Sequence, residues 1–517
     1  MSFLPPTPPP EKPKQRAERN KKVFQREQVT AAKVETQSFL MQLSFSISPF
    51  QNIQEMGSKV QAMVTDRISE LPKELLHDIL SLLPAKYVVR TSVLSTKWEN
   101  IWASVPNLDC EFETLPIVWR ESVSLPDGIT WEDEHVSDHV DFMTFVDRVL
   151  YFRCDSVIKK FRLHCYCRVE DAPRIDGWIR AAIRRNVVEL DLCVQAHRDD
   201  YQEDPPLEFP RRVFMCKTLE VLKVKSDFIT YAPPTSGCFP SLKVLDIRVD
   251  NPEADSMEKF FSCCPVLEDL SLFACVTDGR LWNFKVSAPK LKRLKMTFLT
   301  DLYDDNNPKY YISINAPELE QLDIKQDFLS NYSFVNLKSP VKGSVDFYCH
   351  LGKLQRHFFE RATALLKTFA NVKYLSISAH FVAGCLPAFN HLTELKLLVF
   401  DCYHWDLLTQ LLKKSNNLES LVIEYEEDEE CVEDHEELER YSKEDLWSTP
   451  ESVPICVTGH LKTITIRGLE GYPHVKKVAK CLLNSGKVLT KMTVDNEELY
   501  KELMLEGGSR TCLVEVV

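Results

Sequence analysis

The chain is 517 residues long, has a formal net charge of −13, and contains 17 cysteines and only 14 glycines. This length allows two or three domains with sizeable cores. The low glycine content argues against glycine-rich phosphate loops and β-propellers, and the many cysteines are typical of small buried side chains in a reducing compartment. No apolar run reaches the roughly 18 residues that a membrane span needs. Composition therefore predicts a location in the cytoplasm or nucleus and no membrane partner.

The negative charge is concentrated in one segment. Residues 424–445 contain thirteen Asp or Glu against Arg440 and Lys443, a local balance of −11 that leaves −2 for the remainder. A nucleic-acid binder should show a basic face, so no nucleic-acid partner is expected. The carboxylates and His435 could hold a cation, but calcium loops need glycine and fixed ligand spacing. We therefore expect a solvated loop here and no metal site.

Residues 1–64 are predicted to form a disordered tail. The segment is first proline-rich and then basic, without the repeating apolar residues that a packed element needs. The basic cluster between Lys12 and Arg26 would suit a nuclear-import signal, but basic runs are more often solvated. Met56 and Met63 are natural start sites just before the next segment, so the tail is expected to be optional.

Residues 65–114 have the pattern of three short helices. Pro72 stands where a helix can begin, because its missing N–H would be unpaired there anyway, and Pro84 ends that helix. Between these prolines, leucine and isoleucine recur at three- and four-residue steps, and the apolar stripe is wider than one internal contact needs. The pattern alone fits either a small helical cap on a larger domain or a docking face for a partner helix.

Two further helices are expected after the first. The second covers residues 86–94, and its apolar side chains are Val88, Val89 and Val93. The third begins at Ser95 or Thr96, which with Glu99 would make a capping box. Its large apolar side chains are Trp98, Ile101 and Trp102. Pro106 closes the unit.

The run from Asp66 to Trp102 resembles a plant F-box: D-R-I-S-x-L-P-x-E-L-L-x-x-I-L-S-x-L-P, then V-x-T-S-V-L-S, a Lys-Trp pair and a later Trp. Departures are Lys73 for Asp, Ala85 for Thr and Lys97 for Arg, and none removes an apolar anchor. The resemblance implies docking to the Skp-family adaptor of SCF-type cullin–RING ubiquitin ligases, and through it to cullin and RING subunits. The implied adaptor-facing residues are Leu71, Pro72, Leu75, Leu76, Ile79, Leu80, Leu83 and Pro84. Trp98 is expected to pack internally.

Residues 155–425 repeat the pattern L-x-x-L-x-L. From Leu222 to Leu322 the central leucines step by 23, 25, 24 and 28 residues, in or near the range of about 20–29 residues of leucine-rich repeats. Each unit is one short strand plus a return segment, and it buries its apolar side only by stacking on its neighbours. An ordinary α/β sheet with amphipathic strands is the alternative, but it explains so regular a series poorly. Degenerate copies are expected at residues 158–163 and 187–192, and a weak copy near 341–347.

In each L-x-L strand the two leucines point inward, so the residue between them faces out on the concave surface. These outward residues are the candidates for contact with a target: Lys223, Asp246, Ser271, Lys295, Asp323, Ser376 and Lys396. The series resembles the irregular leucine-rich repeats of plant F-box proteins, in which Cys-Pro or Ala-Pro often precedes the first leucine, as at Cys264-Pro265 and Ala288-Pro289.

The rest of the chain is predicted to be linkers and a terminal cap. Residues 115–154 are expected to connect the F-box to the repeats, and residues 426–450 to form the acidic linker. Residues 451–497 resemble the FBD domain that follows leucine-rich repeats in plant F-box proteins, through V-P-x-C, H-L-K-x-I-x-I-x-G and V-L-x-K-M-T. A strand, a helix and a strand are expected there, which would cap the open repeat array. Residues 498–517 are expected to be a tail.

The sequence lacks the usual catalytic and nucleotide-binding motifs: G-x-S-x-G, G-x-x-x-x-G-K-[ST], G-x-G-x-x-G, H-E-x-x-H and C-x-x-C are all absent. The His and two Cys within residues 164–167 are too close together to close a tetrahedral zinc site without distant partners. Core packing explains Cys263-Cys264, and a solvated helix face explains His135 and His139. We therefore expect no catalytic residue, no cofactor and no metal.

Together these patterns predict an α/β protein. It consists of an N-terminal three-helix F-box, an irregular leucine-rich-repeat solenoid with a parallel sheet and outer helices or loops, and an αβ FBD cap. The resemblance implies a non-catalytic subunit that recruits a target protein to an SCF-type ubiquitin ligase. One alternative is a ligand-sensing or scaffolding repeat protein that acts without the ligase. Another is a stand-alone enzyme, but the sequence contains no recognisable set of reactive residues.

Overall fold

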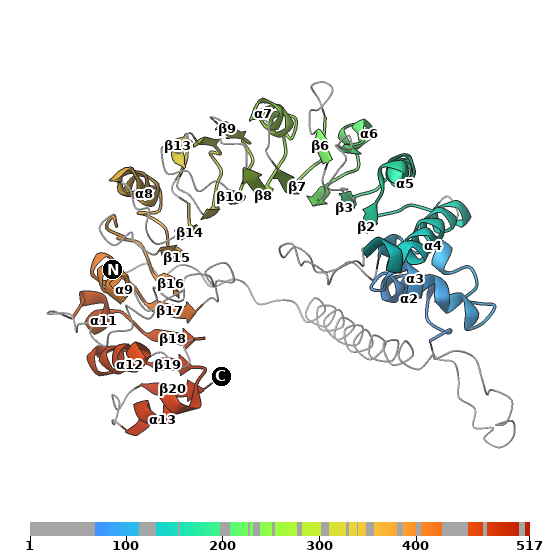
Figure 1. The fold of residues 1–517 in the computed structure, drawn as a ribbon. Coiled ribbons are helices and arrows are strands. Elements are labelled where there is room, and N and C mark those ends of the chain that lie inside the picture. The colour runs from blue at the N-terminus through green and yellow to red at the C-terminus, as the bar shows by residue number, and fades with distance from the viewer. Residues whose placement is uncertain are drawn as a thin grey trace, which may run out of the picture. The chain divides into compact units, whose positions relative to one another are not determined.

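The fold is that of a computed structural model (Figure 1). It describes residues 68–112, 131–153, 156–196, 207–225, 228–230, 238–250, 254–276, 282–300, 310–326, 330–338, 340–347, 356–379, 386–399, 405–425, 453–468, 473–505 and 512–516. These residues form two compact units: the first ends at Asp109 and also includes residues 151–156, and the second contains residues 110–150 and 157–517. The predicted N-terminal tail and acidic linker lie outside the described residues.

The first unit contains the F-box-like segment. Its elements are α2 (Lys73–Leu80), α3 (Ala85–Arg90) and the 3-10 helices η1 (Thr91–Val93) and η2 (Trp102–Ser104). Pro72 and Pro84 are the N-caps of the two α-helices. The predicted second helix ends early, because the Thr91 hydroxyl donates to the Val88 carbonyl at 2.7 Å and the next residues are poor helix formers. The predicted third helix is reduced to turns and η2.

The second unit is built on one 15-stranded sheet, with strand order β1-β2-β3-β5-β7-β8-β10-β12-β14-β15-β16-β17-β18-β19-β20. These strands are β1 (Asn107–Glu111), β2 (Lys160–Cys167), β3 (Glu189–Ala196), β5 (Val221–Lys225), β7 (Val244–Asp250), β8 (Asp269–Val276), β10 (Arg293–Thr300), β12 (Gln321–Gln326), β14 (Lys342–Phe347), β15 (Tyr374–Ala379), β16 (Glu394–Val399), β17 (Ser420–Tyr425), β18 (Thr463–Arg467), β19 (Lys491–Val494) and β20 (Leu513–Val516). The chain passes from the first unit to the second within β1.

Helices and smaller sheets accompany this large sheet. The helices are α4 (Trp131–Phe152), α5 (Ala172–Arg184), α6 (Arg211–Phe214), α7 (Ala254–Ser262), α8 (Arg356–Thr368), α9 (Trp405–Lys414), α11 (Ile455–Gly459), α12 (Pro473–Ser485) and α13 (Glu497–Leu505), with the 3-10 helix η3 (Val169–Asp171). The smaller sheets join β4 (Leu207–Glu208) to β6 (Phe228–Thr230), and β9 (Trp282–Ser287), β11 (Tyr310–Asn315) and β13 (Asn331–Val335) to one another. Within the second unit the large sheet lines the inner side, and α5, α7, α8 and α9 lie on its outer side (Figure 1).

Parallel pairing aligns the repeats. From β2 to β20 every neighbouring pair is parallel, and the central leucines occupy one register position: Leu222 pairs with Leu245, which pairs with Leu270 and so on. The repeated leucines are completely or almost completely buried. Each such side chain contributes about 1.5–3 kcal/mol to folding. The predicted solenoid is thus confirmed, including its degenerate copies.

Two further features of the sequence repeat with this register. A row of phenylalanine rings runs through the core behind the strands, with centroids 5.3–6.1 Å apart: Phe209, Phe214, Phe239, Phe260, Phe261, Phe284 and Phe298. At the start of β5, β7, β8, β10 and β12, the residue before the strand alternates in charge: Glu220, Lys243, Glu268, Lys292 and Glu320. Lys243 pairs with Glu220 at 3.0 Å, and Lys292 with Glu268 at 2.8 Å. We call these residues the rim row.

The weak copy near residue 341 is a true repeat strand, β14, with a substitution at its centre. Gly343 stands between Leu322 and Leu375 at the position of the central leucine. The ring of Phe369, which follows α8, fills the missing volume. A Cβ atom added to Gly343 would lie 2.2 Å from that ring. Leucine cannot occupy this position because the phenylalanine already does.

The C-terminal part confirms the predicted strand-helix-strand cap, as β18, α12 and β19, and corrects the predicted tail. Residues 498–517 are not simply a tail, because α13 packs on β19 and β20, and β20 adds a parallel strand beyond β19. The Asn496 side chain accepts hydrogen bonds from the backbone N–H groups of Glu498 and Leu499, which caps α13. Within the predicted connector, residues 131–152 form α4.

Candidate functional site

The first candidate surface belongs to the F-box-like segment. Its core is a single small cluster of buried side chains: Leu76, Leu80, Val88, Trp98, Ile101 and Val105. The Trp98 indole donates to the Ser69 hydroxyl at 2.7 Å, which confirms its internal role. The structure corrects the adaptor-facing assignment at Leu76 and Leu80, which are each 1% exposed inside this cluster. They hold the segment together and do not present a surface.

The other adaptor-facing candidates divide into two groups. Leu71 and Leu83 are partly buried against the core cluster. Pro72 is exposed, and Leu75, Ile79 and Pro84 are half-buried. The wide apolar stripe of the sequence is therefore two stripes side by side. One packs inward, and the other, from Pro72 through Leu75 and Ile79, lies at the surface.

Sequence reasoning missed the most exposed apolar residues of the F-box-like segment, residues 68–109. Val93 is 85% exposed and Leu94 56%, and Leu82 and Ile68 are also exposed. Val93 was expected inside the second helix, but that helix stops at Arg90 and the 3-10 turn rotates Val93 outward. Large apolar side chains exposed in neighbouring positions are typical of docking surfaces. The signal in the sequence is the Thr-Ser pair at residues 91–92, which interrupts the helix.

The second candidate surface is the inner face of the large sheet. The seven predicted outward residues fall on one register row, since Lys223 pairs with Asp246, Asp246 with Ser271, and Ser271 with Lys295. The row continues through Asp323, Ser344, Ser376 and Lys396. We call it the central row. Sequence reasoning missed Ser344, because Gly343 hid its repeat.

Several residues of the central row already have a partner. Lys396 pairs with Glu424 at 3.1 Å, and Asp323 accepts a hydrogen bond from Gln321 at 2.7 Å. Burial raises the pKa of the Asp323 carboxyl, although that hydrogen bond and the nearby Lys295 act to lower it. Ser376 is almost completely buried. The charge along the row is therefore uneven, because the exposed cation Lys295 lies between the neutral Ser271 and the hydrogen-bonded Asp323.

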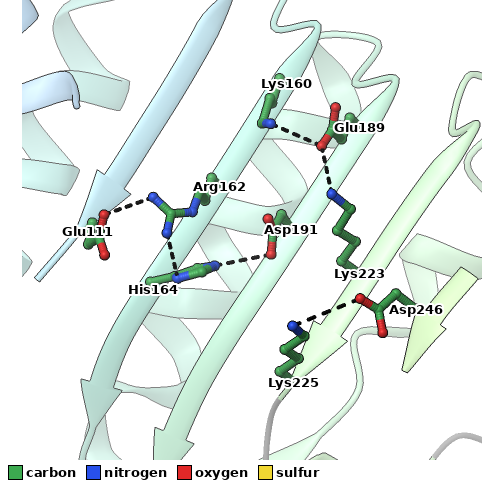
Figure 2. A network of polar contacts seen from close by, with 9 residues as sticks. All are labelled: Glu111, Lys160, Arg162, His164, Glu189, Asp191, Lys223, Lys225 and Asp246. Atoms are coloured by element: carbon green, nitrogen blue, oxygen red, sulfur yellow. Dashed lines mark hydrogen bonds and ion pairs between the residues drawn. The ribbon is translucent and has the colours of Figure 1, made fainter. Parts of the chain in front are cut away.

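At its N-terminal end the inner face carries a network of ion pairs (Figure 2). Arg162 binds Glu111 at 2.8 Å and His164 at 3.1 Å, and His164 Nε2 lies 3.1 Å from Asp191. Beside it, Glu189 accepts from Lys160 at 3.0 Å and lies 3.5 Å from Lys223. The side chains come from four neighbouring strands, so the network ties the first repeats together.

The hydrogen-bond partners of His164 determine which ring nitrogen carries its proton. A guanidinium group only donates, so His164 Nδ1 must accept from Arg162 and the ring proton lies on Nε2, which donates to Asp191. Burial disfavours the Asp191 carboxylate, but the His164 hydrogen bond and neighbouring cations outweigh it and lower the pKa of Asp191. All donors and acceptors here face one another, which is typical of a structural network.

Cys165 and Cys264 do not have the environment of a reactive thiol, and the described residues hold no metal cluster. Cys165 and Cys264 are buried, and burial raises the pKa of both thiols, so neither is a ready thiolate. The part of the chain that the structure describes holds no group of three or more His, Cys, Asp or Glu arranged to bind a metal ion. His139 is not the solvated residue that was expected, since it lies 3.2 Å from Asp171. None of the described helices is long and apolar enough to cross a membrane.

Comparison with known proteins agrees with this architecture. An F-box domain model matches residues 68–109, the leucine-rich repeats of the FBD-associated F-box protein At5g56370 match residues 175–343, and an FBD model matches residues 449–494.

Relatives come from Arabidopsis thaliana. F-box/LRR-repeat protein At3g59200 is 34% identical, with 69% of this chain and 69% of the relative covered. F-box/LRR-repeat protein At4g14103 is 32% identical, with 69% of this chain and 91% of the relative covered. FBD-associated F-box protein At5g27750 is 30% identical, with 87% of this chain and 98% of the relative covered. The chain therefore belongs to the plant F-box/LRR-repeat family, with an FBD domain after its repeats.

Proposed function

We propose that this chain is the substrate-recruiting subunit of an SCF-type cullin–RING E3 ubiquitin ligase. The F-box docks a Skp-family adaptor, which links it to the cullin and RING subunits, and the inner face of the repeat sheet binds a target protein. Ubiquitin transfer then gains from the effective concentration of a tethered target. The chain acts as a non-catalytic adaptor in the cytoplasm or nucleus, without cofactor, metal, nucleic acid or membrane partner.

The observation that carries this proposal is the apolar surface of the F-box. Val93 and Leu94 are exposed side by side in a unit whose own core is complete without them. An F-box domain model matches this segment, and F-box domains generally bind Skp-family adaptors. The half-buried Leu75 and Ile79 on α2 add to the apolar area that an adaptor would cover. Burying such side chains at an interface is the largest favourable contribution to docking.

The test is capture of the full-length chain by an immobilised, purified Skp-family adaptor. Wild type is compared with Val93→Asp/Leu94→Asp, which places two carboxylates on the proposed surface. We expect the double variant to bind at least about 100-fold more weakly, because unpaired charges would be buried. Leu71→Ala/Pro72→Ala is a less selective variant, since Leu71 also packs on the F-box core.

A matched control uses the same substitution elsewhere. Val453 and Ile455, near the start of the FBD domain, are exposed apolar residues as well. Val453→Asp/Ile455→Asp should be captured as wild type is, and far-UV circular dichroism should show that all variants are folded. Folded wild type that fails to bind, or equal capture of Val93→Asp/Leu94→Asp, would refute the adaptor role.

A further inference from the structure

The large sheet ends at β20 with apolar side chains exposed to solvent. In the register of β18, β19 and β20 one core position is occupied by Ile466, Val494 and Val516. Ile466 is 1% and Val494 0% exposed, whereas Val516 is 41% exposed. On the inner face Leu513 follows Lys491 and is 57% exposed. The terminal repeat of a solenoid needs a polar outer face for solubility, so this end has the character of a surface that a further strand would cover.

The backbone of β20 offers hydrogen-bonding groups at its outer edge. Among the described residues β20 has a strand neighbour on one side only, and it is the last strand in the order of the sheet (Figure 1). The Leu513 N–H donates to the Thr490 carbonyl, just before β19, at 2.9 Å. Because the backbone groups of successive strand residues point alternately to opposite sides, those of Val514 and Val516 point away from β19. Another extended chain can complete the ladder there.

Other edge strands of this protein are protected in ways that β20 is not. In the three-stranded sheet α7 packs beside β9, and α8 packs beside β13. At the opposite end of the large sheet, β1 carries Asp109 and Glu111. Lysine, proline and β-bulges also protect edges, and β20 contains no lysine or proline and pairs with β19 without a shift in register. Its one charged residue, Glu515, already pairs with Lys491 at 2.6 Å.

The edge of β20 is complementary to the same edge of a second copy. In an antiparallel pair with Val514 opposite its counterpart, the outward N–H and C=O groups of the two strands meet. The valine side chains then lie together on the core side, and Leu513 lies opposite Glu515 of the second copy. No two carboxylates face each other in this register. Antiparallel pairs are more stable per residue than parallel pairs, and two-fold symmetry is the commonest arrangement of protein dimers.

A second copy also covers the core side of the joint, which a single bound peptide would leave open. In this unit α13 packs on β20 and on β19. Two-fold pairing brings the α13 of the second copy to the same side of the extended sheet, next to the first. Val516 and Met504, which is 55% exposed on α13, would then lie between two helix-covered strands. Burial of such apolar surface favours association.

We propose that two copies of this chain associate through β20, in an antiparallel pair that joins their large sheets end to end. This inference does not depend on the ligase role. The pairing surface consists of residues 512–516 of each copy and the adjoining part of α13. Because it is small, the dimer is weak, with a Kd on the order of 10 µM. Its contacts are backbone hydrogen bonds and apolar side chains, so salt has little effect on it.

The experiment is sedimentation equilibrium of the full-length chain, from about 1 to 200 µM and with a reductant present. Wild type should change from the mass of one chain to the mass of two. Val516→Lys, which puts a charge on the edge, should weaken association at least about tenfold. Val514→Pro should do the same, because it removes an N–H that points away from β19.

The matched control is Val335→Lys. Val335 lies on the edge strand β13 and is 43% exposed, close to the value for Val516. This variant should associate as wild type does, and far-UV circular dichroism should show that every variant is folded. A wild type that remains a single chain at about 200 µM, equal weakening in Val335→Lys, or unchanged association in Val516→Lys and Val514→Pro would overturn the inference.

A competing peptide separates a second copy from any other extended partner. A peptide of residues 508–517 with Cys512→Ser should dissociate the dimer, because it repeats the sequence of β20. The same peptide with an N-methyl group on Val514 lacks the outward donor and should compete at least about tenfold more weakly. Equal competition by a peptide of the same composition in scrambled order would overturn the assignment, since the edge would then accept any apolar strand.

Discussion

The F-box and the repeat domain use apolar side chains in opposite ways. In the F-box one cluster of six buried residues forms the core, while Val93 and Leu94 of the same short unit are exposed. In the repeat domain the leucines at the repeat positions are buried, and the central row of the inner face is polar or charged from Lys223 to Lys396. The F-box therefore depends on a small core and offers an apolar surface, whereas the repeats have a deep core and offer a charged one.

Under the proposed function, this difference gives the chain two kinds of recognition. Docking through exposed apolar side chains depends weakly on salt, because no charge is neutralised. Docking on a charged sheet face depends strongly on salt, since exposed charges are screened within about 10 Å at 0.1 M ionic strength. The two partners of such a chain can then bind independently, and their contributions can be separated by ionic strength alone.

The largest expected effect concerns the deep core of the repeats. Phe260 is completely buried, and its ring contacts those of Phe214, Phe239 and Phe261. Phe260→Ala should lower the free energy of unfolding of the repeat domain by about 3–5 kcal/mol, because it leaves a cavity in the phenylalanine row. Urea unfolding followed by circular dichroism measures the change. Tyr311→Ala, at a ring of the same domain that is 51% exposed, should have a much smaller effect. Similar losses for both variants would contradict the assigned core.

A smaller but more selective effect is expected in the F-box. Leu80 lies in its only described core cluster, so Leu80→Ala should cost about 2–5 kcal/mol. Because a unit of this size is marginally stable, adaptor capture should be lost while the main unfolding transition of the repeats stays in place. Leu82→Ala, at a half-exposed side chain, should leave stability within about 0.5 kcal/mol. If Leu80→Ala shifted the repeat transition instead, the two units would not be independent.

Much of the repeat domain could be predicted from the sequence. The period-two alternation of strands and the spacing of the leucines fix which residues point inward, and the parallel register then places all seven predicted outward residues in one row.

The F-box surface and the strand β20 are harder to predict from the sequence than the repeats are. The apolar pattern of the first helix does not show which of two adjacent stripes packs inward, so Leu76 and Leu80 were placed on the surface. Val93 falls within the predicted second helix, because periodicity does not show that the helix ends at Arg90. The final strand, β20, is formed by pairing with β19, and four residues in isolation carry too little pattern to reveal such a partner.

Replacing Gly343 tests how tightly the repeat core is packed, because a glycine with no close neighbours, Gly177, is available for comparison. Gly343→Ala should destabilise the repeat domain by about 1–3 kcal/mol, because the new methyl group would overlap the buried Phe369 ring. Gly177→Ala in α5 is the matched control, since nothing lies within 4 Å of the added atom. There alanine should stabilise the helix by about 0.5–1 kcal/mol. Thermal unfolding of both variants gives the opposite signs, and the same sign for both would contradict the packing.

The smallest expected effect concerns the rim row. It tests whether the rim charges are needed for stability once the backbone has aligned the strands. Lys292 and Glu268 are about 40% exposed and form an ion pair at 2.8 Å, which raises the pKa of Lys292 and lowers that of Glu268. Lys292→Met keeps the length of the side chain and removes its charge. Because solvent screens exposed pairs, the melting temperature should be unchanged at physiological salt and fall only slightly at low salt. The backbone bond from the Lys292 N–H to the Glu268 carbonyl, 2.8 Å long, survives the substitution and keeps the strands aligned. A large loss at physiological salt would mean that the alternating charges, and not the buried leucines, hold neighbouring repeats together.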